Sequence, residues 1–173
     1  MTGDYVSDAR RSETTLEPLM AALGVPWAAR KLMNAMTTRL SYSHVPGRLD
    51  VVTNGKPTGT FVLDGMERDK ETAGTKLGRP ERRITCTEDV SRSRVVVLSK
   101  LLLPERLAGG TIRDVYTVIE GGAAIHREVD IRMPQQPPAR VSRILTRVAG
   151  SAPPAMRAAP AADTDTDTAD DIH

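Results

Sequence analysis

Residues 15–32 read TLEPLMAALGVPWAARKL, and they predict two short helices joined by a tight turn. Thr15 suits the N-cap better than Thr14, because a cap at Thr14 would put Pro18 where its missing N–H is needed. Gly24 can adopt the left-handed conformation that ends a helix, and Pro26 fits the first turn of the next helix. Apolar residues recur along one face of the first helix at Leu16, Leu19, Met20 and Leu23. The second helix is predicted to end at residue 36, and its apolar face contains Ala28, Ala29, Leu32, Met33 and Met36.

After residue 37 the helical period ends, and apolar residues alternate or run in short blocks rich in Val, Ile and Thr. The blocks predict nine strands near residues 38–44, 48–54, 59–65, 67–74, 81–88, 92–102, 111–119, 123–133 and 140–148, and residues 3–10 predict a first strand before the helices. Glycine and proline turns separate them, so consecutive strands should pair antiparallel. Closing the sheet on itself removes its exposed edges, which predicts a mainly β fold, a ten-stranded antiparallel up-and-down barrel capped by the helix pair. A barrel of this size can leave an internal cavity.

The composition favours one globular domain followed by a tail. The chain has 173 residues, 39% of them hydrophobic and 27% charged, while aromatic residues make up only 3%. We expect residues 1–149 to form the barrel and residues 150–173, rich in Ala, Pro, Thr and Asp, to form a disordered acidic tail. Cys86 is the single cysteine, which excludes an internal disulfide. Because the chain has only three histidines beside it, a structural zinc site is implausible.

Localisation and partners follow from what the sequence lacks. No apolar run reaches the ~18 residues of a membrane span, and the first residues lack the order of a secretion signal, so we expect a cytoplasmic protein. The tail contains five aspartates and one arginine, which leaves the preceding residues basic. A basic body suits an anionic membrane surface better than nucleic acid, because aromatic stacking positions and a basic helix stripe are missing.

The helical stretch resembles the lid of the cytosolic fatty-acid-binding proteins, a family of intracellular lipid-binding proteins in the calycin superfamily. The matching residues are Ala22-Leu23-Gly24-Val25 and Ala29-Arg30-Lys31 in the lid, Phe61-Val62-Leu63-Asp64-Gly65 and Glu71-Thr72-Ala73-Gly74 in two paired strands, and Val141-Ser142-Arg143-Ile144-Leu145 in the last strand. Gly3 and Tyr5 stand where the family has a glycine and an early aromatic residue. The resemblance covers residues 2–148 and implies a barrel that holds one long-chain fatty acid or a related lipid in a water-filled cavity.

In that family an Arg-x-Tyr motif on the last strand binds the ligand carboxylate. Arg143 matches its arginine, whereas Leu145 replaces its tyrosine. Arg127 shares an apolar strand face with Ile125, Val129, Ile131 and Met133, and is costly there unless paired or hydrated, so it is a second candidate for the head group. Tyr116 is the polar candidate of an inward set that also contains Ile112, Asp114 and Val118. The alternatives are that Arg143 faces solvent and that the head of Arg127 reaches water at a strand end.

Other residues are expected to contact the ligand chain or to form the portal. The chain should meet Met20, Leu23, Trp27, Met33, Phe61, Leu63 and Ile84. By the resemblance, the portal lies between the second helix and the turns at Lys56-Pro57-Thr58 and Ala73-Gly74. Arg30 and Lys31 could there steer the protein toward anionic membranes. Each apolar residue, taken singly, also suits an ordinary core.

We therefore expect a monomeric protein that binds a fatty acid or similar amphiphile reversibly, for transport or buffering. The alternative is a barrel that has lost or filled its cavity and serves as an interaction protein. Phosphate loops, dinucleotide fingerprints and nucleophile elbows do not occur, so we expect no enzyme, no cofactor and no metal. Cys86 alternates with Ile84 on an inner face, which predicts a buried thiol, and His126 lies on a polar face, which predicts a surface position.

Overall fold

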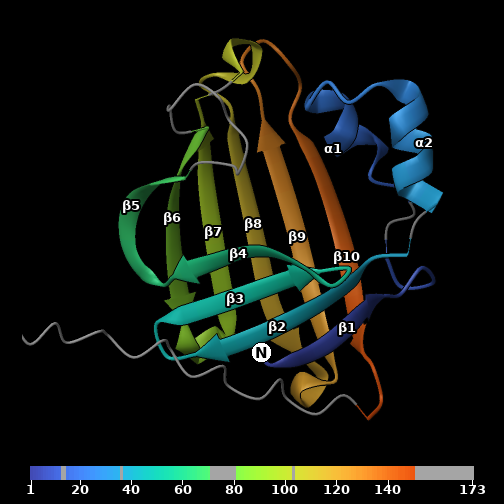
Figure 1. The fold of residues 1–173 in the computed structure, drawn as a ribbon, viewed down its shortest axis with the longest axis vertical. Coiled ribbons are helices and arrows are strands. Elements are labelled where there is room, and N and C mark those ends of the chain that lie inside the picture. The colour runs from blue at the N-terminus through green and yellow to red at the C-terminus, as the bar shows by residue number, and fades with distance from the viewer. Residues whose placement is uncertain (13–14, 36, 71–80, 103, 151–173) are drawn as a thin grey trace, which may run out of the picture.

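A computed structural model describes residues 1–12, 15–35, 37–70, 81–102 and 104–150 of the chain. Ten strands and two α-helices follow one another in these residues (Figure 1). They are β1 (Gly3–Ser7), α1 (Glu17–Ala22), α2 (Trp27–Ala35), β2 (Arg39–Val45), β3 (Arg48–Thr53), β4 (Lys56–Val62), β5 (Asp64–Lys70), β6 (Arg82–Asp89), β7 (Arg94–Leu101), β8 (Thr111–Ile119), β9 (Ala124–Arg132) and β10 (Ala139–Arg147). The predicted order of one strand, two helices and nine strands is confirmed.

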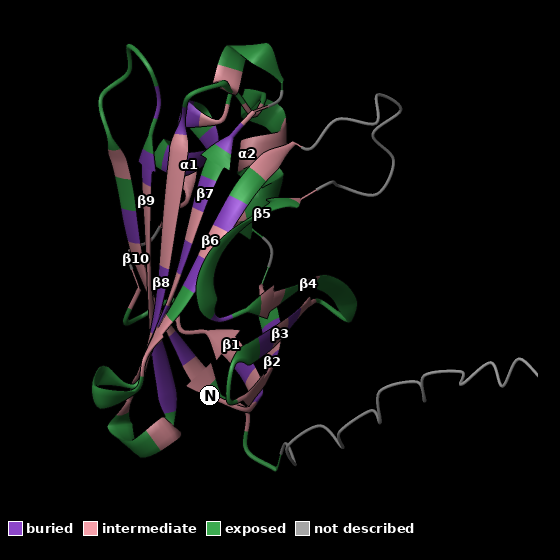
Figure 2. Ribbon diagram, turned by 90° about the vertical axis from the view of Figure 1, so that its left-hand side faces the viewer, coloured by how far each residue is buried: buried purple, intermediate pink, exposed green. Residues whose placement is uncertain are grey.

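The ten strands form one antiparallel sheet with the order β4-β3-β2-β1-β10-β9-β8-β7-β6-β5. Pairing of β1 with β10 joins the first strands to the last. In Figure 1, β1–β4 lie across the lower part of the layer formed by β6–β10, and Figure 2 shows the two layers from the side. His44 Nε2 on β2 lies 2.9 Å from Glu88 Oε1 on β6, a polar contact that connects the layers.

The barrel is nearly closed, with one gap between two neighbouring strands, so the expectation of a sheet without edges is corrected. The sheet order ends at β4 and β5, which do not pair with each other. The motif Phe61-Val62-Leu63-Asp64-Gly65 spans this break, because Leu63 lies between the strands and donates its N–H to the Gly47 carbonyl. Consequently β4 and β5 lie about three residues earlier than predicted. Pro57 on β4 and the charged residues of β5 are typical of edge strands.

The two helices lie beside the upper end of β10 (Figure 1). The N-cap of α1 is Leu16, one residue later than the predicted Thr15, although the Thr15 hydroxyl still accepts the N–H of Glu17. Gly24 has the expected positive φ of 70°. Asn34 ties the helices together, since its side chain bonds both to the N–H of Leu16 and to the hydroxyl of Thr15. Helix α1 buries Leu19, Met20 and Ala22, whereas α2 buries no residue. Neither helix has the length and apolar character needed to cross a membrane.

Two apolar clusters form the core. The larger one lies where the layers cross and contains Tyr5, Leu40, Tyr42, Leu49, Val51, Leu63, Ile84, Cys86, Val95, Val97, Tyr116, Ile125 and Leu145. The smaller one lies beneath α1 and contains Leu19, Ala22, Leu101, Ile131, Met133 and Val141. The buried position of Cys86 is as predicted. The acidic tail lies outside the described residues, apart from Gly150.

Candidate functional site

The last three strands place Tyr116, Arg127 and Arg143 in one row. Tyr116 of β8 lies opposite Arg127 of β9, which in turn lies opposite Arg143 of β10. Side chains alternate along a strand, so this row shares its face with residues two positions away, such as the buried Ile125 and Leu145. All three predicted head-group candidates therefore point toward the inside of the barrel.

Arg127 has its own acidic partner. Its Nε and Nη2 donate to the two carboxylate oxygens of Asp114 at 3.0 and 2.6 Å, which is the two-pronged geometry of a strong ion pair. The hydroxyl of Tyr116 donates to the same carboxylate at 2.8 Å, and the guanidinium lies 5.4 Å from the Tyr116 ring. Burial by itself lowers the pKa of Arg127, but its interactions with Tyr116 and Asp114 outweigh this and raise the pKa. Arg127 thus stays charged, and Asp114 compensates its charge.

Arg143 has no such partner. It forms no ion pair with a described residue, and its Nε is buried without a hydrogen bond. Burial and the nearby charge of Arg127 lower the pKa of Arg143, as expected for a cation that is short of favourable contacts. With Asp114 compensating Arg127, the row retains one uncompensated positive charge.

A second unpartnered polar group belongs to Tyr42 on β2. Its side chain is fully buried, its ring centroid lies 5.7 Å from that of Tyr116, and its hydroxyl makes no hydrogen bond within the part of the chain that the structure describes. Burial raises the pKa of Tyr42, so the hydroxyl keeps its proton and can donate it to an acceptor. Buried donors left without acceptors cost free energy, and their presence beside a charged group indicates a place for a ligand acceptor.

Sequence reasoning identified part of this site. It predicted that Asp114 lies on the inner face but did not predict its ion pair with Arg127. The antiparallel register of β8 and β9 brings position 114 within reach of Arg127 and could have indicated this pair. Tyr42 was missed, because it lies 74 positions before Tyr116 and no local pattern connects them. Arg113 and His126 face outward as expected, where Arg113 approaches Asp130 at 3.6 Å and His126 Nε2 lies 2.6 Å from the Ser142 hydroxyl.

The predicted chain and portal residues separate into three groups. Buried or partly buried within the molecule are Met20, Leu23, Phe61, Leu63, Ile84 and Leu145. Trp27 and Met33 on α2 are 64% and 46% exposed, and Lys56 is exposed at the start of β4. Trp27 and Met33 therefore lie on the outer surface instead of inside the barrel, and a role at its mouth stays a prediction. Ala73 lies outside the described residues.

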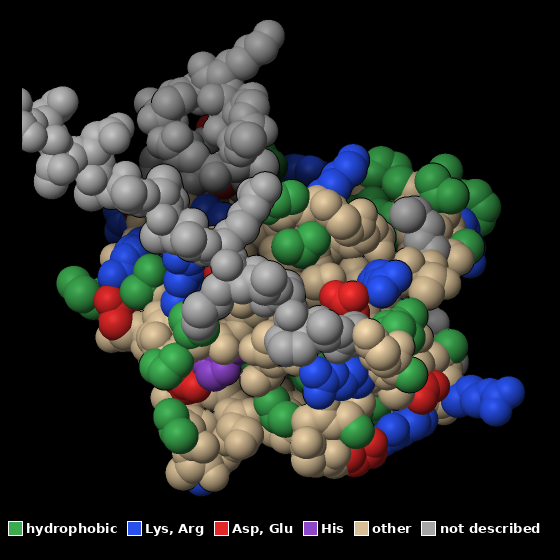
Figure 3. Space-filling view, turned by 60° about the horizontal axis from the view of Figure 1, so that its bottom comes forward, with side chains coloured by type: hydrophobic (Ala, Val, Ile, Leu, Met, Phe, Trp, Pro, Cys, Tyr) green, Lys and Arg blue, Asp and Glu red, His purple; other side chains and the backbone are tan. Residues whose placement is uncertain are grey.

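The end of the barrel opposite the helices contains a hollow that is separate from this row. It measures about 460 Å³, opens to solvent and is lined by Gly121, Gly122, Ala123, Thr146, Arg147, Val148, Ala149 and Gly150. Basic and acidic side chains are interspersed over this end of the molecule (Figure 3). None of the predicted head-group residues lines the hollow, so it does not extend the candidate site.

Solved structures with lipid ligands share this fold, whereas protein-family models and curated proteins give no match to the sequence. A structure described as the REP1-NXSQ fatty acid transporter is 21% identical over 85% of this chain and 95% of its own, with a TM-score of 0.59. The fatty acid binding protein of Schistosoma mansoni in complex with arachidonic acid is 19% identical over 86% and 96%, with a TM-score of 0.57. The zebrafish ileal bile acid-binding protein complexed with cholic acid is 12% identical over 85% and 98%, with a TM-score of 0.58. The chain therefore has the fold of the intracellular lipid-binding proteins, as its sequence predicts.

Proposed function

We propose that the protein binds a long-chain fatty acid or a similar amphiphile reversibly, with the carboxylate at Arg143. The observation that carries this proposal is the inward guanidinium of Arg143, which no described acidic residue compensates. An arginine remains charged at physiological pH and donates two parallel hydrogen bonds to a carboxylate. The similar structures bind fatty acids and bile acids according to their descriptions, which agrees with this ligand class. Capture and release require no chemical step.

Tyr42 is proposed to replace the hydroxyl that Leu145 cannot supply. Its ring packs against that of Tyr116, which bonds to Asp114, and its hydroxyl, unpartnered among the described residues, would donate to the second carboxylate oxygen. The acyl chain would lie against apolar side chains such as the partly buried Phe61 and the buried Ile84. Each buried methylene contributes roughly 0.8 kcal/mol before ordering costs are subtracted, so the chain supplies most of the affinity and the polar groups set the orientation.

A barrel with a filled interior is the second candidate. The observation that favours it is the packing of Tyr5, Tyr42 and Tyr116, whose successive ring centroids are each 5.7 Å apart inside the larger cluster. Such a protein would act through its outer surface and would bind no lipid. The two candidates differ in whether palmitate enters the barrel.

Displacement of a fluorescent fatty-acid probe tests this difference. We expect palmitate to displace the probe at micromolar protein, and Tyr42→Phe to weaken palmitate binding by at least about tenfold, because a hydrogen bond to a charged carboxylate contributes about 1.5–3 kcal/mol. The matched control is Tyr5→Phe, since the Tyr5 hydroxyl already donates to the Gly122 carbonyl, and its affinity should equal that of the wild type. Absence of displacement in folded protein would support the filled barrel.

Helix α2 is proposed to contact anionic membranes when the ligand is transferred. Trp27 and Leu32 are 64% and 66% exposed on it, and Lys31 lies 5.8 Å from the Trp27 ring. Arg30 contributes less than expected to this surface, because it pairs with Glu17 at 3.0 Å. Exposed apolar residues next to a cation suit an anionic lipid surface.

Fluorescence of Trp27, the single tryptophan, reports this contact directly. We expect Leu32→Gln to lower partitioning into anionic vesicles by about fivefold, the effect of about 1 kcal/mol of lost apolar burial. Met66→Gln is the control, because Met66 is 63% exposed on β5, away from the helices. Equal partitioning of both variants would exclude α2 as the contact surface.

A further inference from the structure

A second pair of cations faces the interior on the opposite part of the sheet. Lys70 at the end of β5 lies directly opposite Arg82 at the start of β6. Arg82 shares its strand face with the buried Ile84 and Cys86, so both cations belong to the inner side of the sheet. They lie at the break in the barrel, where β5 does not pair with β4.

Lys70 reaches across this break toward β4. Its Nζ lies 4.8 Å from the ring centroid of Phe61, and a Cβ at Gly59 would come within 2.6 Å of the same atom. The absence of a side chain at Gly59 therefore leaves the room that the ammonium group occupies. Burial and the charge of Arg82 lower the pKa of Lys70, and the smaller effect of Cys86 does not offset them.

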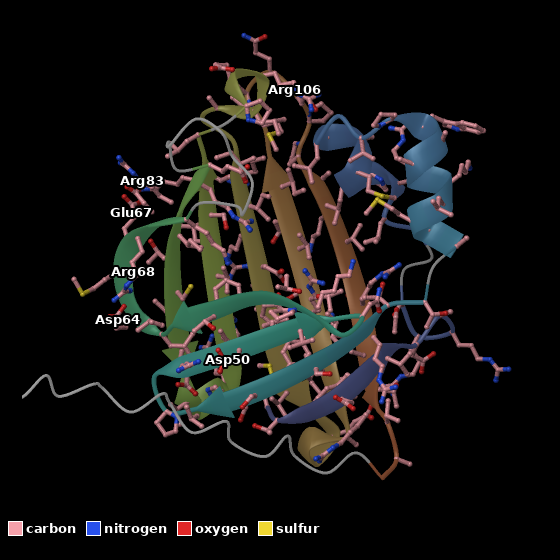
Figure 4. The ribbon with its side chains drawn as sticks, viewed as in Figure 1. Asp50, Asp64, Glu67, Arg68, Arg83 and Arg106 are labelled. Carbon is pink, nitrogen blue, oxygen red and sulfur yellow. The ribbon has the colours of Figure 1, made fainter. Side chains whose placement is uncertain are left out.

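Neither cation has an acidic partner among the described residues. Other cations on the same two strands do have one, and Figure 4 labels Arg68 with Asp64 and Arg83 with Glu67. Arg68 pairs with Asp64 at 2.6 Å, and Arg83 pairs with Asp69 at 3.1 Å. Like charges directly opposite each other destabilise a sheet, and the aromatic face of Phe61 offsets only part of that cost. An anion between Lys70 and Arg82 would remove the repulsion.

This pair is well separated from Arg143. The row of Arg143 continues through Tyr116 and Val95 to Glu88 on β6. Arg82 lies six residues before Glu88 on that strand, so it is offset from this row by about 20 Å along β6, at roughly 3.3 Å per residue. A small anion cannot bridge the two places, whereas the two ends of a long amphiphile can.

We propose that Lys70 and Arg82 form a second anion subsite, and that the preferred ligand is an amphiphile with an acidic group at each end, such as a long-chain dicarboxylate. This inference rests on the proposed function, because it assigns the other end of the ligand bound at Arg143. The apolar chain would run between the two subsites, with Phe61 beside the second. A monocarboxylate would fill only the first.

Calorimetric titration of hexadecanedioate and palmitate tests the second subsite. In Lys70→Met and in Arg82→Gln, we expect the affinity for hexadecanedioate to fall about tenfold and that for palmitate to change by less than twofold. The matched control is Arg83→Gln, because Arg83 is the next residue of β6, lies on its outer face and should affect neither ligand. Circular dichroism of each variant verifies the fold before titration.

The outcomes separate this inference from the proposed function. Equal losses for both ligands, or a loss for neither while palmitate still binds, would overturn the second subsite and leave the first intact. Failure of wild-type protein to bind palmitate and hexadecanedioate would overturn both. A loss confined to the dicarboxylate in both variants would support the assignment.

Discussion

Replacing Arg143 with methionine is expected to lower the affinity for palmitate by about 10- to 100-fold while making the ligand-free protein more stable. Hydrogen bonds to a charged group contribute about 1.5–3 kcal/mol, and each 1.4 kcal/mol corresponds to a tenfold change in affinity. Stability should rise by about 1 kcal/mol, since an uncompensated cation leaves the interior and solvent already screens part of its cost. Probe displacement and urea unfolding measure the two effects.

Arg140→Met is the matched control for this prediction. Arg140 lies on the same strand but on the outer face, where it pairs with Glu128 and Asp130. Its replacement should leave the affinity for palmitate unchanged. A ligand site at Arg143 predicts opposite signs for affinity and stability, whereas a purely structural arginine predicts that stability falls. An unchanged affinity in Arg143→Met would therefore remove the central observation of the proposed function.

The second large effect is expected at Asp114. Asp114→Asn should lower the free energy of unfolding by about 3–5 kcal/mol, because it leaves the charge of Arg127 in the interior without its carboxylate. The side chains of Arg127 and Asp114 are 30% and 14% exposed, so solvent replaces little of the lost interaction. Thermal unfolding followed by circular dichroism should show a midpoint lower by roughly 10 °C.

Two further variants make the Asp114 prediction specific. In Asp130→Asn, removal of an outer-face carboxylate that lies 3.6 Å from both Arg113 and Arg140 should cost less than about 1 kcal/mol. Combining Asp114→Leu with Arg127→Met removes both charges and should recover most of the lost stability. If Asp114→Asn unfolds at the wild-type temperature, the buried ion pair does not hold β8 and β9 together as described.

Local patterns in the sequence were sufficient for the order of the elements and for which side chains share a strand face. The three- and four-residue spacing around Leu19 predicted α1. Strict alternation placed Arg127 on an apolar strand face and grouped Arg143 with Leu145, while the family resemblance favoured the inward direction of Arg143. Alternation is a property of a single strand, so it needs no knowledge of the partner strand. The same reasoning placed His126 on the outer face.

The tertiary structure alone decided which of these side chains meet. Asp114 compensates Arg127, Tyr42 lies against Tyr116, and Lys70 reaches over Phe61, because register and barrel curvature bring these distant positions together. The break between β4 and β5 also depends on the whole sheet, since closure requires matching twist and stagger around all ten strands. The sequence by itself therefore determined the order of the elements and which side chains share a face, through short-range periodicity. The pairing of charges, which depends on contacts between distant strands, was decided by the folded barrel.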